Sequence, residues 1–380
     1  MKFKEYKGLD LPGLAADVLK EWDAQDTFHK SISTREGHPT FVFYEGPPSA
    51  NGTPGIHHVM ARTIKDIFCR YKTQQGYLVH RKAGWDTHGL PVELGVEKKL
   101  GITKEDIGRT ISIEEYNRAC REAVMEYTGL WEELTRKMGY WVNMDAPYIT
   151  YDNKYIETLW WLLKQLFDKG LLYKGYTIQP YSPAAGTGLS THELNQPGCY
   201  RDVKDTTCTS QFRVIRDAKS EKLFEGIEGE LYFLAWTTTP WTLPSNLMLA
   251  VGNDISYAVM EEDGQKYVLA EALLGRYKQQ LAKAERVGTL KGSELVGLSY
   301  EPMFPYFKHL KEKGAFRVLA GEFVSTEDGT GVVHIAPGFG QDDFEACRAY
   351  DENFPVVCPV DEAGKFTAEV SDYAGKQVFE

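Results

Sequence analysis

The sequence predicts an α/β protein whose second half changes to mainly β structure. In residues 40–86 an apolar run, a loop broken by glycine and proline, a segment of helical period and a second apolar run follow one another, which is the order of a βαβ unit. From about residue 195 onward, short β-branched and aromatic runs are separated by Gly, Asp and Pro, which is typical of short strands.

The βαβ unit starts with a predicted buried strand at 40–44, which ends at 45–48 because the prolines there cannot continue a ladder. Apolar residues then recur at steps of three and four from Ile56 to Tyr71, and this period predicts a helix that closes near 74–76. Residues 77–81 are the second predicted strand, parallel to the first.

The other predicted elements follow from the same patterns. In the first half we expect helices at 14–26, 112–139 and 152–169 and a strand at 171–179. In the second half we expect strands at 231–237, 257–259, 266–270 and 331–335.

Composition limits the class of protein. With 380 residues, 42% of them hydrophobic, the chain can bury more than one core, and we expect two domains. The opening residues are too charged for a signal peptide and no run of about 18 apolar residues predicts a membrane span, so we expect a cytoplasmic protein. The net charge of -11 counts against a simple nucleic-acid-binding module. The six cysteines form no Cys-x-x-Cys pair and are expected to be free thiols.

Two adjacent histidines, His57 and His58, stand where the loop after the first predicted strand becomes a helix. The N-terminus of a helix presents unpaired N–H groups and the positive end of its dipole, so this position predicts a nucleotide-phosphate site. The alternative is a solvated helix start without a ligand.

The loop at 84–93 places Asp86 and His88 after the second predicted strand, at the edge where α/β proteins bind ligands. Asp86 is a candidate partner for a substrate ammonium group, although an acid in a glycine-rich loop also serves as a turn-former.

In the second half, three consecutive threonines (237–239) and the segment 329–343 combine hydroxyls, a histidine at a strand end and an acidic pair. A site built from these groups is one interpretation. An edge strand and a helix cap are the structural alternative.

Several of these segments together resemble the N-terminal part of the class I aminoacyl-tRNA synthetases, in their isoleucyl branch. The segments that carry the resemblance are Pro-Pro-x-Ala-Asn-Gly at 47–52, Gly-Trp-Asp-x-His-Gly-Leu-Pro-x-Glu at 84–93, Trp160-Trp161, and 236–246. The resemblance implies an N-terminal extension at 1–39, the first half of a Rossmann-like nucleotide-binding catalytic domain at 40–194, and an inserted, mainly β editing domain at 195–380.

The resemblance also implies the chemistry: activation of isoleucine with ATP, transfer to tRNA(Ile), and hydrolytic editing of mischarged valyl-tRNA, with Mg2+ accompanying ATP. The implied ATP-binding residues are Pro48, Asn51, Gly52, Gly55, His57 and His58, of which the two histidines are catalytic. The implied amino-acid-binding residues are Pro47 and Asp86. The implied editing residues are Thr237, Thr238, Thr239, Asn246, His334 and Asp343.

The sequence departs from the family pattern in three places. The usual His-x-Gly-His motif is exchanged to Gly55-Ile56-His57-His58, which we interpret as a functional variant. Ser182 and Ala185 stand where many relatives carry a Cys-x-x-Cys zinc knuckle, so we predict no zinc and no other metal site in this chain. A Lys-Met-Ser-Lys-Ser loop is absent.

Because that loop completes the ATP site in the family, we expect a monomeric fragment that is synthetically inactive by itself. A fragment that only binds ligand or tRNA, and an isolated aminoacyl-tRNA deacylase, are the alternatives.

Overall fold

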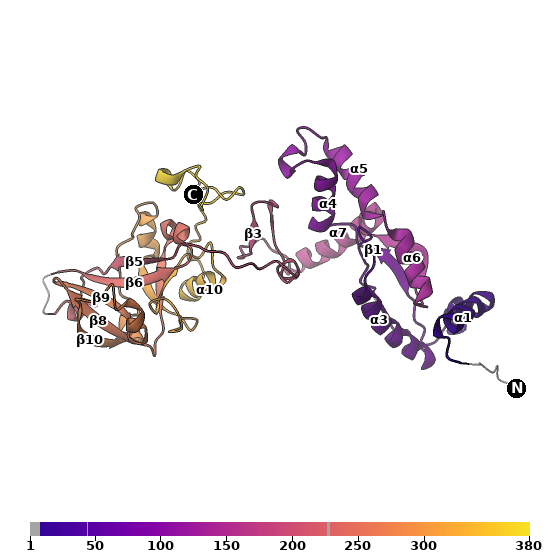
Figure 1. Ribbon diagram of the computed structural model, residues 1–380, viewed down its shortest axis with the longest axis horizontal. Coiled ribbons are helices and arrows are strands. Elements are labelled where there is room, and N and C mark those ends of the chain that lie inside the picture. Colours follow the sequence, from indigo (N-terminus) through magenta and orange to yellow (C-terminus); the bar gives the residue numbers. More distant parts are fainter. Residues whose placement is uncertain (1–7, 44, 226–228) are drawn as a thin grey trace. The chain divides into compact units, whose positions relative to one another are not determined.

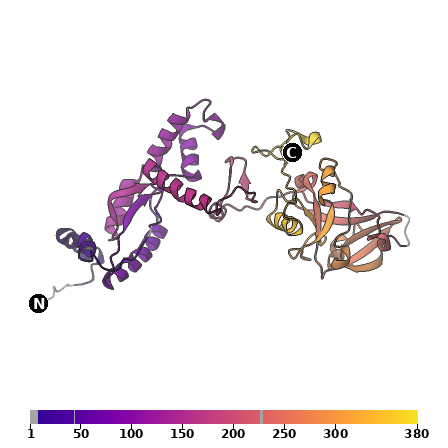
Figure 2. The ribbon, with the colours of Figure 1, turned by 180° about the vertical axis from the view of Figure 1, so that it is seen from behind.

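A computed structural model describes residues 8–43, 45–225 and 229–380 of the chain. The chain divides into two compact units, Met1–Gly175 and Tyr176–Glu380, whose ribbons are seen from both sides in Figures 1 and 2. The domain boundary at 194/195 was predicted from the family resemblance. The division into compact units does not test it, so it stays a prediction.

The first unit is mainly helical around a short parallel strand pair. Its helices are α1 (Leu11–Gln25), α2 (Thr27–Ser33), α3 (Ile56–Gln74), α4 (Leu90–Leu100), α5 (Ile113–Val124), α6 (Thr128–Lys137) and α7 (Asn153–Asp168), with a 3-10 turn η1 (Lys104–Asp106). Its strands are β1 (Lys82–Trp85) and β2 (Asn143–Ile149), which pair in parallel with a register shift between Lys82 and Gly84.

The sequence placed the strands of this unit imprecisely. Residues 41–43 are not in a strand, Val42 is exposed and Tyr44 lies outside the described residues, so a single parallel bridge from Thr40 to Leu78 is what remains of the predicted pair. The second predicted strand, 77–81, is also wrong apart from that bridge, because β1 begins only at the next residue, Lys82. The main partner of β1 is β2, which was not predicted.

The predicted helix 112–139 is two helices. Ser112 caps α5, since its Oγ accepts a hydrogen bond from the Glu115 N–H at 3.2 Å. The chain then turns between α5 and α6, and there the Tyr127 N–H donates to the Ala50 carbonyl at 3.1 Å. The break therefore holds the loop that precedes α3.

A buried ion pair fastens α3 to the strand pair. Arg81, just before β1, donates to the Asp66 carboxylate of α3 at 3.0 Å, and the two side chains are 1% and 13% exposed. Arg70 binds the second Asp66 oxygen at 2.6 Å and stacks on the Trp141 ring at 3.9 Å. Both charges are thus satisfied away from water, as burial requires.

The second unit is built on a sheet. Within its described residues the strands are β3 (Tyr181–Ser182), β4 (Thr187–Gly188), β5 (Cys208–Arg213), β6 (Leu231–Thr237), β7 (Met248–Val251), β8 (Ser256–Glu262), β9 (Gln265–Ala270), β10 (Glu285–Lys291), β11 (Arg317–Ala320) and β12 (Val332–Ile335). The α-helices are α8 (Thr191–Leu194), α9 (Gly292–Leu295) and α10 (Gln341–Tyr350). The 3-10 helices are η2 (Glu221–Phe224), η3 (Pro240–Ser245), η4 (Glu271–Tyr277), η5 (Lys308–Lys313) and η6 (Ser371–Tyr373).

Eight of the described strands form one sheet in the order β10-β8-β9-β6-β12-β7-β11, with β5 paired to β6. The strand β6 pairs with β5 along its length, while its parallel partners are β9 near its start and β12 at Trp236. All four strands predicted in this half are confirmed, because each is β-branched or apolar and buried on at least one face.

The predicted strand 171–179 is wrong. This segment has no partner strand in the described part of the chain, and Leu171, Tyr173 and Tyr176 are largely exposed. None of the helices formed by the described residues has the length and apolar character that a membrane crossing needs.

We predict that Asp66→Asn lowers the free energy of unfolding of the first unit by about 3 kcal/mol, because it leaves the buried Arg81 charge unpaired. Denaturant titration followed by tryptophan fluorescence measures this, since Trp141 stacks on Arg70. Glu133→Gln removes the exposed Lys137 ion pair and is the matched control, expected to leave stability unchanged. Equal effects of the two substitutions would contradict the prediction.

Candidate active sites

The loop at 47–55 is held in place from two elements of the first unit. The Asp86 N–H, directly after β1, donates to the Pro48 carbonyl at 3.0 Å. The Trp131 indole N–H, from α6, donates to the Gly52 carbonyl at 3.0 Å. The structure therefore brings the predicted ATP-loop residue Pro48 next to the predicted amino-acid-binding residue Asp86, at the carboxyl end of β1.

His58 closes the N-terminus of α3. Its Nδ1 accepts the Gly55 N–H at 2.9 Å, so the neutral ring carries its proton on Nε2. Its ring meets the Trp131 ring edge-on at 4.7 Å. Burial, and after it the neighbouring His57 and Arg62, lower the pKa of His58. His58 is thereby kept neutral, with a hydrogen on Nε2.

His57 lies beside this cap and is exposed, with its ring centroid 3.8 Å from that of His58. The ring also lies against Gly55: a Cβ placed on Gly55 would be 2.9 Å from the His57 Cε1 atom. Gly55 has φ -109°, which any residue adopts, so the glycine is needed for space and not for backbone freedom. The exchanged pair, Gly55 and His57, is thus sterically coupled.

Threonine hydroxyls connect the ends of β1 and β2. The Thr150 Oγ accepts the Thr87 N–H at 3.0 Å, and it lies 2.8 Å from the Thr87 Oγ and 2.9 Å from the His88 Nδ1. This bond network fixes the backbone that carries the half-buried Asp86.

Arg62 was missed by sequence reasoning. It is 8% exposed, donates to the Thr135 Oγ at 2.6 Å, and lies over the rings of Trp131 and Tyr140 at 5.7 and 4.9 Å. Because it stands four residues after His58 on α3, helical periodicity is the signal that could have placed it under the histidine.

Apolar side chains stay exposed on two helices of this unit. On α3 the exposed residues are Ile56, Met60, Ile64, Ile67, Phe68 and Tyr71, and on α7 they include Leu159, Trp160, Trp161, Leu162, Leu166 and Phe167. Patches of this kind mark contact surfaces.

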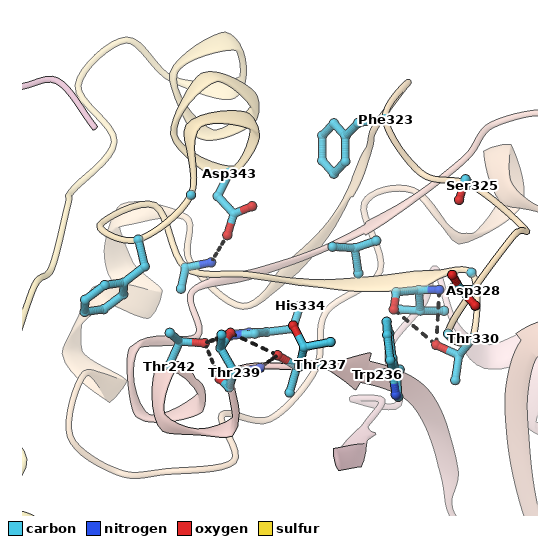
Figure 3. A pocket seen from close by; sticks show the side chains of 18 of the residues that line it. Trp236, Thr237, Thr239, Thr242, Phe323, Ser325, Asp328, Thr330, His334 and Asp343 are labelled. Carbon is cyan, nitrogen blue, oxygen red and sulfur yellow. Dashed lines mark hydrogen bonds between the residues drawn. The ribbon is translucent and has the colours of Figure 1, made fainter. Parts of the chain in front are cut away.

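The second unit has a cavity of about 410 Å³ (Figure 3). It is lined by the end of β6, by η3, by the segment 328–334 that leads into β12, and by the first turn of α10. In Figure 3 the labelled Thr237, Thr239 and Thr242 gather beside His334, while Trp236, Asp328 and Thr330 lie toward the other end. The lining includes the predicted residues Thr237, Thr238, Thr239, His334 and Asp343.

Asp343 supplies a carboxylate to this cavity from the first turn of α10. One of its oxygens accepts the Ala336 N–H at 2.7 Å. Burial, with a smaller contribution from Asp342, raises the pKa of Asp343 to about 6. In the part of the chain that the structure describes, no cationic side chain pairs with Asp343, so the carboxylate is suited to a cationic ligand.

His334 is buried, and both of its ring nitrogens are occupied. Its Nδ1 accepts the Asn246 amide at 2.8 Å, and its Nε2 donates to the Thr242 Oγ at 2.9 Å. Burial lowers the pKa of His334 to about 4, so the ring is neutral at physiological pH. A neutral imidazole with no free nitrogen cannot act as a base toward a ligand in this arrangement.

The threonine segment folds back on itself after β6. The Thr239 N–H donates to the Thr237 Oγ at 3.0 Å, and the Thr242 Oγ donates to the Thr239 carbonyl at 2.8 Å. Thr238 and Thr239 are exposed, so their hydroxyls can reach a ligand.

Asn246 is the one predicted editing residue that does not line the cavity. It is 5% exposed and stands behind His334, where its amide donates to the His334 Nδ1 and the Met248 carbonyl, both at 2.8 Å. Thr242 and Tyr300, which complete its network, were not identified from the sequence.

The described residues contain no group of three or more His, Cys, Asp or Glu side chains arranged to hold a metal ion. The predicted absence of zinc stays a prediction. At the knuckle position, β3 and β4 form a hairpin in which the Ser182 Oγ accepts the Ala185 N–H at 3.2 Å.

Comparison with known proteins identifies the family of the chain. A family model described as tRNA synthetases class I (I, L, M and V) matches residues 17–287. Isoleucine–tRNA ligase of Bacteroides fragilis is 59% identical over 396 residues, covering 99% of this chain and 34% of that protein. The Porphyromonas gingivalis isoleucine–tRNA ligase is also 59% identical, over 397 residues, with the same coverage.

Solved structures align less well. The editing domain of the P. knowlesi cytosolic leucyl-tRNA synthetase aligns at 16% identity with a TM-score of 0.32, over 38% of this chain and 62% of that one. A TM-score of this size does not by itself establish a shared fold. The chain spans about a third of the length of the relatives that it matches. By its match over residues 17–287, the chain belongs to the class I tRNA synthetases of the I, L, M and V group.

Proposed function

We propose that this chain is the N-terminal part of an isoleucine–tRNA ligase. In this proposal the first unit contributes to activation of isoleucine with ATP and its transfer to tRNA(Ile), in the cytoplasm, where protein synthesis takes place. The second unit hydrolyses tRNA mischarged with valine. The observation that carries the proposal is 59% identity to isoleucine–tRNA ligases across 99% of this chain.

The synthetic half-site works by orientation and electrostatics. The isoleucine carboxylate attacks the α-phosphate of ATP and pyrophosphate leaves with its Mg2+, which gives isoleucyl-adenylate. The tRNA ribose hydroxyl then adds to the acyl carbon and gives up its proton, and AMP leaves. The loop with Pro48, Asn51 and Gly52 and the N-terminus of α3 receive the nucleotide. His57 and the Nε2–H of His58 stabilise negative charge on the phosphates.

The amino acid lies next to this loop, against Pro47, with its ammonium group on Asp86. The hydrogen bond from the Asp86 N–H to the Pro48 carbonyl supports this assignment, because it joins the backbone at Asp86 to the loop at 47–55. Mg2+ enters as part of the substrate.

The apolar faces of α3 and α7 support a site completed by more polypeptide. The match covers 34% of the Bacteroides fragilis relative, so about two thirds of that protein lies outside it. Exposed residues such as Ile64, Phe68, Trp160 and Trp161 have the composition of a covered interface. The chain by itself therefore binds ATP without turning it over.

A second, hydrolytic site is needed because the synthetic site can distinguish isoleucine from valine only to a limited extent. Valine lacks one methylene of isoleucine, and a methylene in an apolar pocket discriminates by roughly 10- to 200-fold. A site that hydrolyses the smaller product raises the accuracy further.

The cavity of the second unit has the groups that ester hydrolysis needs. The Asp343 carboxylate binds the ammonium group of the aminoacyl ester, and the hydroxyls of Thr238 and Thr239 bind its polar atoms. A water molecule adds to the ester carbonyl, and the ribose oxygen leaves with a proton. His334 bounds the acyl pocket as a neutral wall, since both of its nitrogens are occupied.

We predict that Asp343→Asn lowers the hydrolysis of valyl-tRNA(Ile) by about a hundredfold, because it removes the charge that holds the ammonium group. Release of valine from mischarged tRNA measures the rate. Asp342→Asn is the matched control: it removes the adjacent, exposed carboxylate and should leave the rate unchanged. No valine release by the unaltered chain, or equal loss in both variants, would sink the editing assignment.

The same carboxylate sets a pH dependence. Ammonium binding needs ionised Asp343, so valine release rises with pH through about 6, the pKa of the free site. The effect on stability has the opposite sign: the folded pKa lies above the ordinary 3.8, so the stabilising contribution is complete below that value and is lost as pH rises toward 6. Rates and unfolding curves from pH 4.5 to 7.5 test both signs. A flat rate profile would contradict the assignment.

A further prediction concerns Gly55. In Gly55→Ala the new Cβ displaces the exposed His57 ring, so affinity for ATP with Mg2+ falls about tenfold while the melting temperature barely changes. In a His57→Ala background the same substitution has no further effect. Calorimetric titration of the four proteins measures this coupling. Gly95→Ala, with open space around it, is the control. Additive effects in the double variant would show that the two residues are independent.

The isolated-deacylase alternative has one observation in its favour: the lining of the cavity lies wholly within the second unit. Pyrophosphate exchange separates the activities. We expect this chain to release valine without supporting exchange, and exchange by this chain alone would overturn the half-site assignment.

A further inference from the structure

A buried chain of hydrogen bonds runs behind the cavity of the second unit. Tyr300 donates to the Asn246 Oδ1 at 2.6 Å, Asn246 donates to the His334 Nδ1 at 2.8 Å, and His334 continues to Thr242 at 2.9 Å. The chain ends on the Thr239 carbonyl, which accepts from the Thr242 Oγ at 2.8 Å. All four side chains are less than 8% exposed.

The direction of each bond in this chain is fixed. The Met248 carbonyl only accepts, so the Asn246 nitrogen must face it, and the second hydrogen of that nitrogen then points at the His334 Nδ1. The Nδ1 is therefore unprotonated, and the neutral ring carries its hydrogen on Nε2. Because the Thr242 hydroxyl donates to the Thr239 carbonyl, it receives the hydrogen of Nε2.

Tyr300 satisfies the remaining group of the network. The Asn246 Oδ1 is buried, and the Tyr300 hydroxyl is the donor that it meets. Tyr300 itself is fully buried and is held by edge contacts with Phe212 and Phe316 at 5.4 and 6.0 Å. The network is thus anchored in the hydrophobic core at one end and in the threonine segment at the other.

We infer that Asn246 and Tyr300 are positioning residues of the editing site, which hold His334 as a neutral hydrogen-bond donor and so fix the threonine segment at the cavity wall. Neither residue needs to touch the substrate. The inference rests on the proposed editing function for its catalytic consequence, whereas the tautomer of His334 is testable by itself.

The first test is Asn246→Asp in the full 380-residue chain labelled with 15N-histidine, with His334→Gln used to assign the His334 signals. A carboxylate at 246 cannot donate to Nδ1 and draws a proton onto it. We expect Nδ1 of the unaltered protein to be unprotonated from pH 5 to 8 and Nδ1 of the variant to be protonated. An Nδ1 that stays unprotonated in Asn246→Asp overturns the inference.

The second test is Tyr300→Phe, which removes only the hydroxyl. We expect the His334 tautomer to persist, while the Asn246 side-chain amide protons exchange with solvent at least about tenfold faster, because their group has lost a buried bond. Ser220→Ala is the matched control, since the Ser220 hydroxyl is equally buried but donates to the Ile215 carbonyl, away from the cavity. Equal exchange rates in Tyr300→Phe and Ser220→Ala would also overturn the inference.

Valine release separates this inference from the proposed function. We expect losses of about a hundredfold in Asn246→Asp and about tenfold in Tyr300→Phe, with none in Ser220→Ala. If the unaltered chain releases no valine, the proposed editing function fails and the two spectroscopic tests still decide the inference. If it does, and both variants keep the full rate, the positioning role is refuted.

Discussion

His334 is held between partners with opposite requirements, and the rest of the second site depends on this. Asn246 can only donate to the ring where it stands, and Thr242 needs a hydrogen from it. One tautomer of a neutral imidazole satisfies both. The threonine segment is therefore fixed through Thr242 and His334, which line the cavity, and through Asn246, which lies behind them. Asp343 faces the same cavity with a carboxylate that has no cationic partner among the described residues.

The first unit uses its histidine in a related way. The His58 Nδ1 accepts the Gly55 N–H, so this ring too is neutral with its hydrogen on Nε2. The two rings differ in the partner of this hydrogen. In His334 the Nε2–H donates to the Thr242 Oγ, whereas His58 is half-buried and no hydrogen-bond partner of its Nε2 is found among the described residues. One backbone or amide donor at Nδ1 is enough to decide the chemical form of each imidazole.

The predictions from sequence succeeded where the signal was local. The strand β6 and the helix α7 were placed to within a few residues, because the spacing of their apolar residues follows the period of a strand or of a helix. The predictions failed where the structure of a segment depends on a residue far away in the sequence. Helix 112–139 breaks where the Tyr127 N–H meets Ala50, and 171–179 has the pattern of a strand but no neighbour to pair with. The family resemblance identified His334 and Asp343 as candidates. It did not identify Tyr300, which lies 54 residues from Asn246 and has no neighbouring sequence motif that indicates the contact.

The exposed faces of α3 and α7 have a consequence for handling the protein in solution. On α7 the adjacent Trp160 and Trp161, each more than half exposed, and Phe167 form an exposed apolar surface. Two copies of the chain can bury such surfaces against each other, because the removal of apolar surface from water is favourable whichever molecule provides the second surface. Such self-association would contradict the expected monomer, and the hydrodynamic size of the isolated chain, measured against concentration, distinguishes the two.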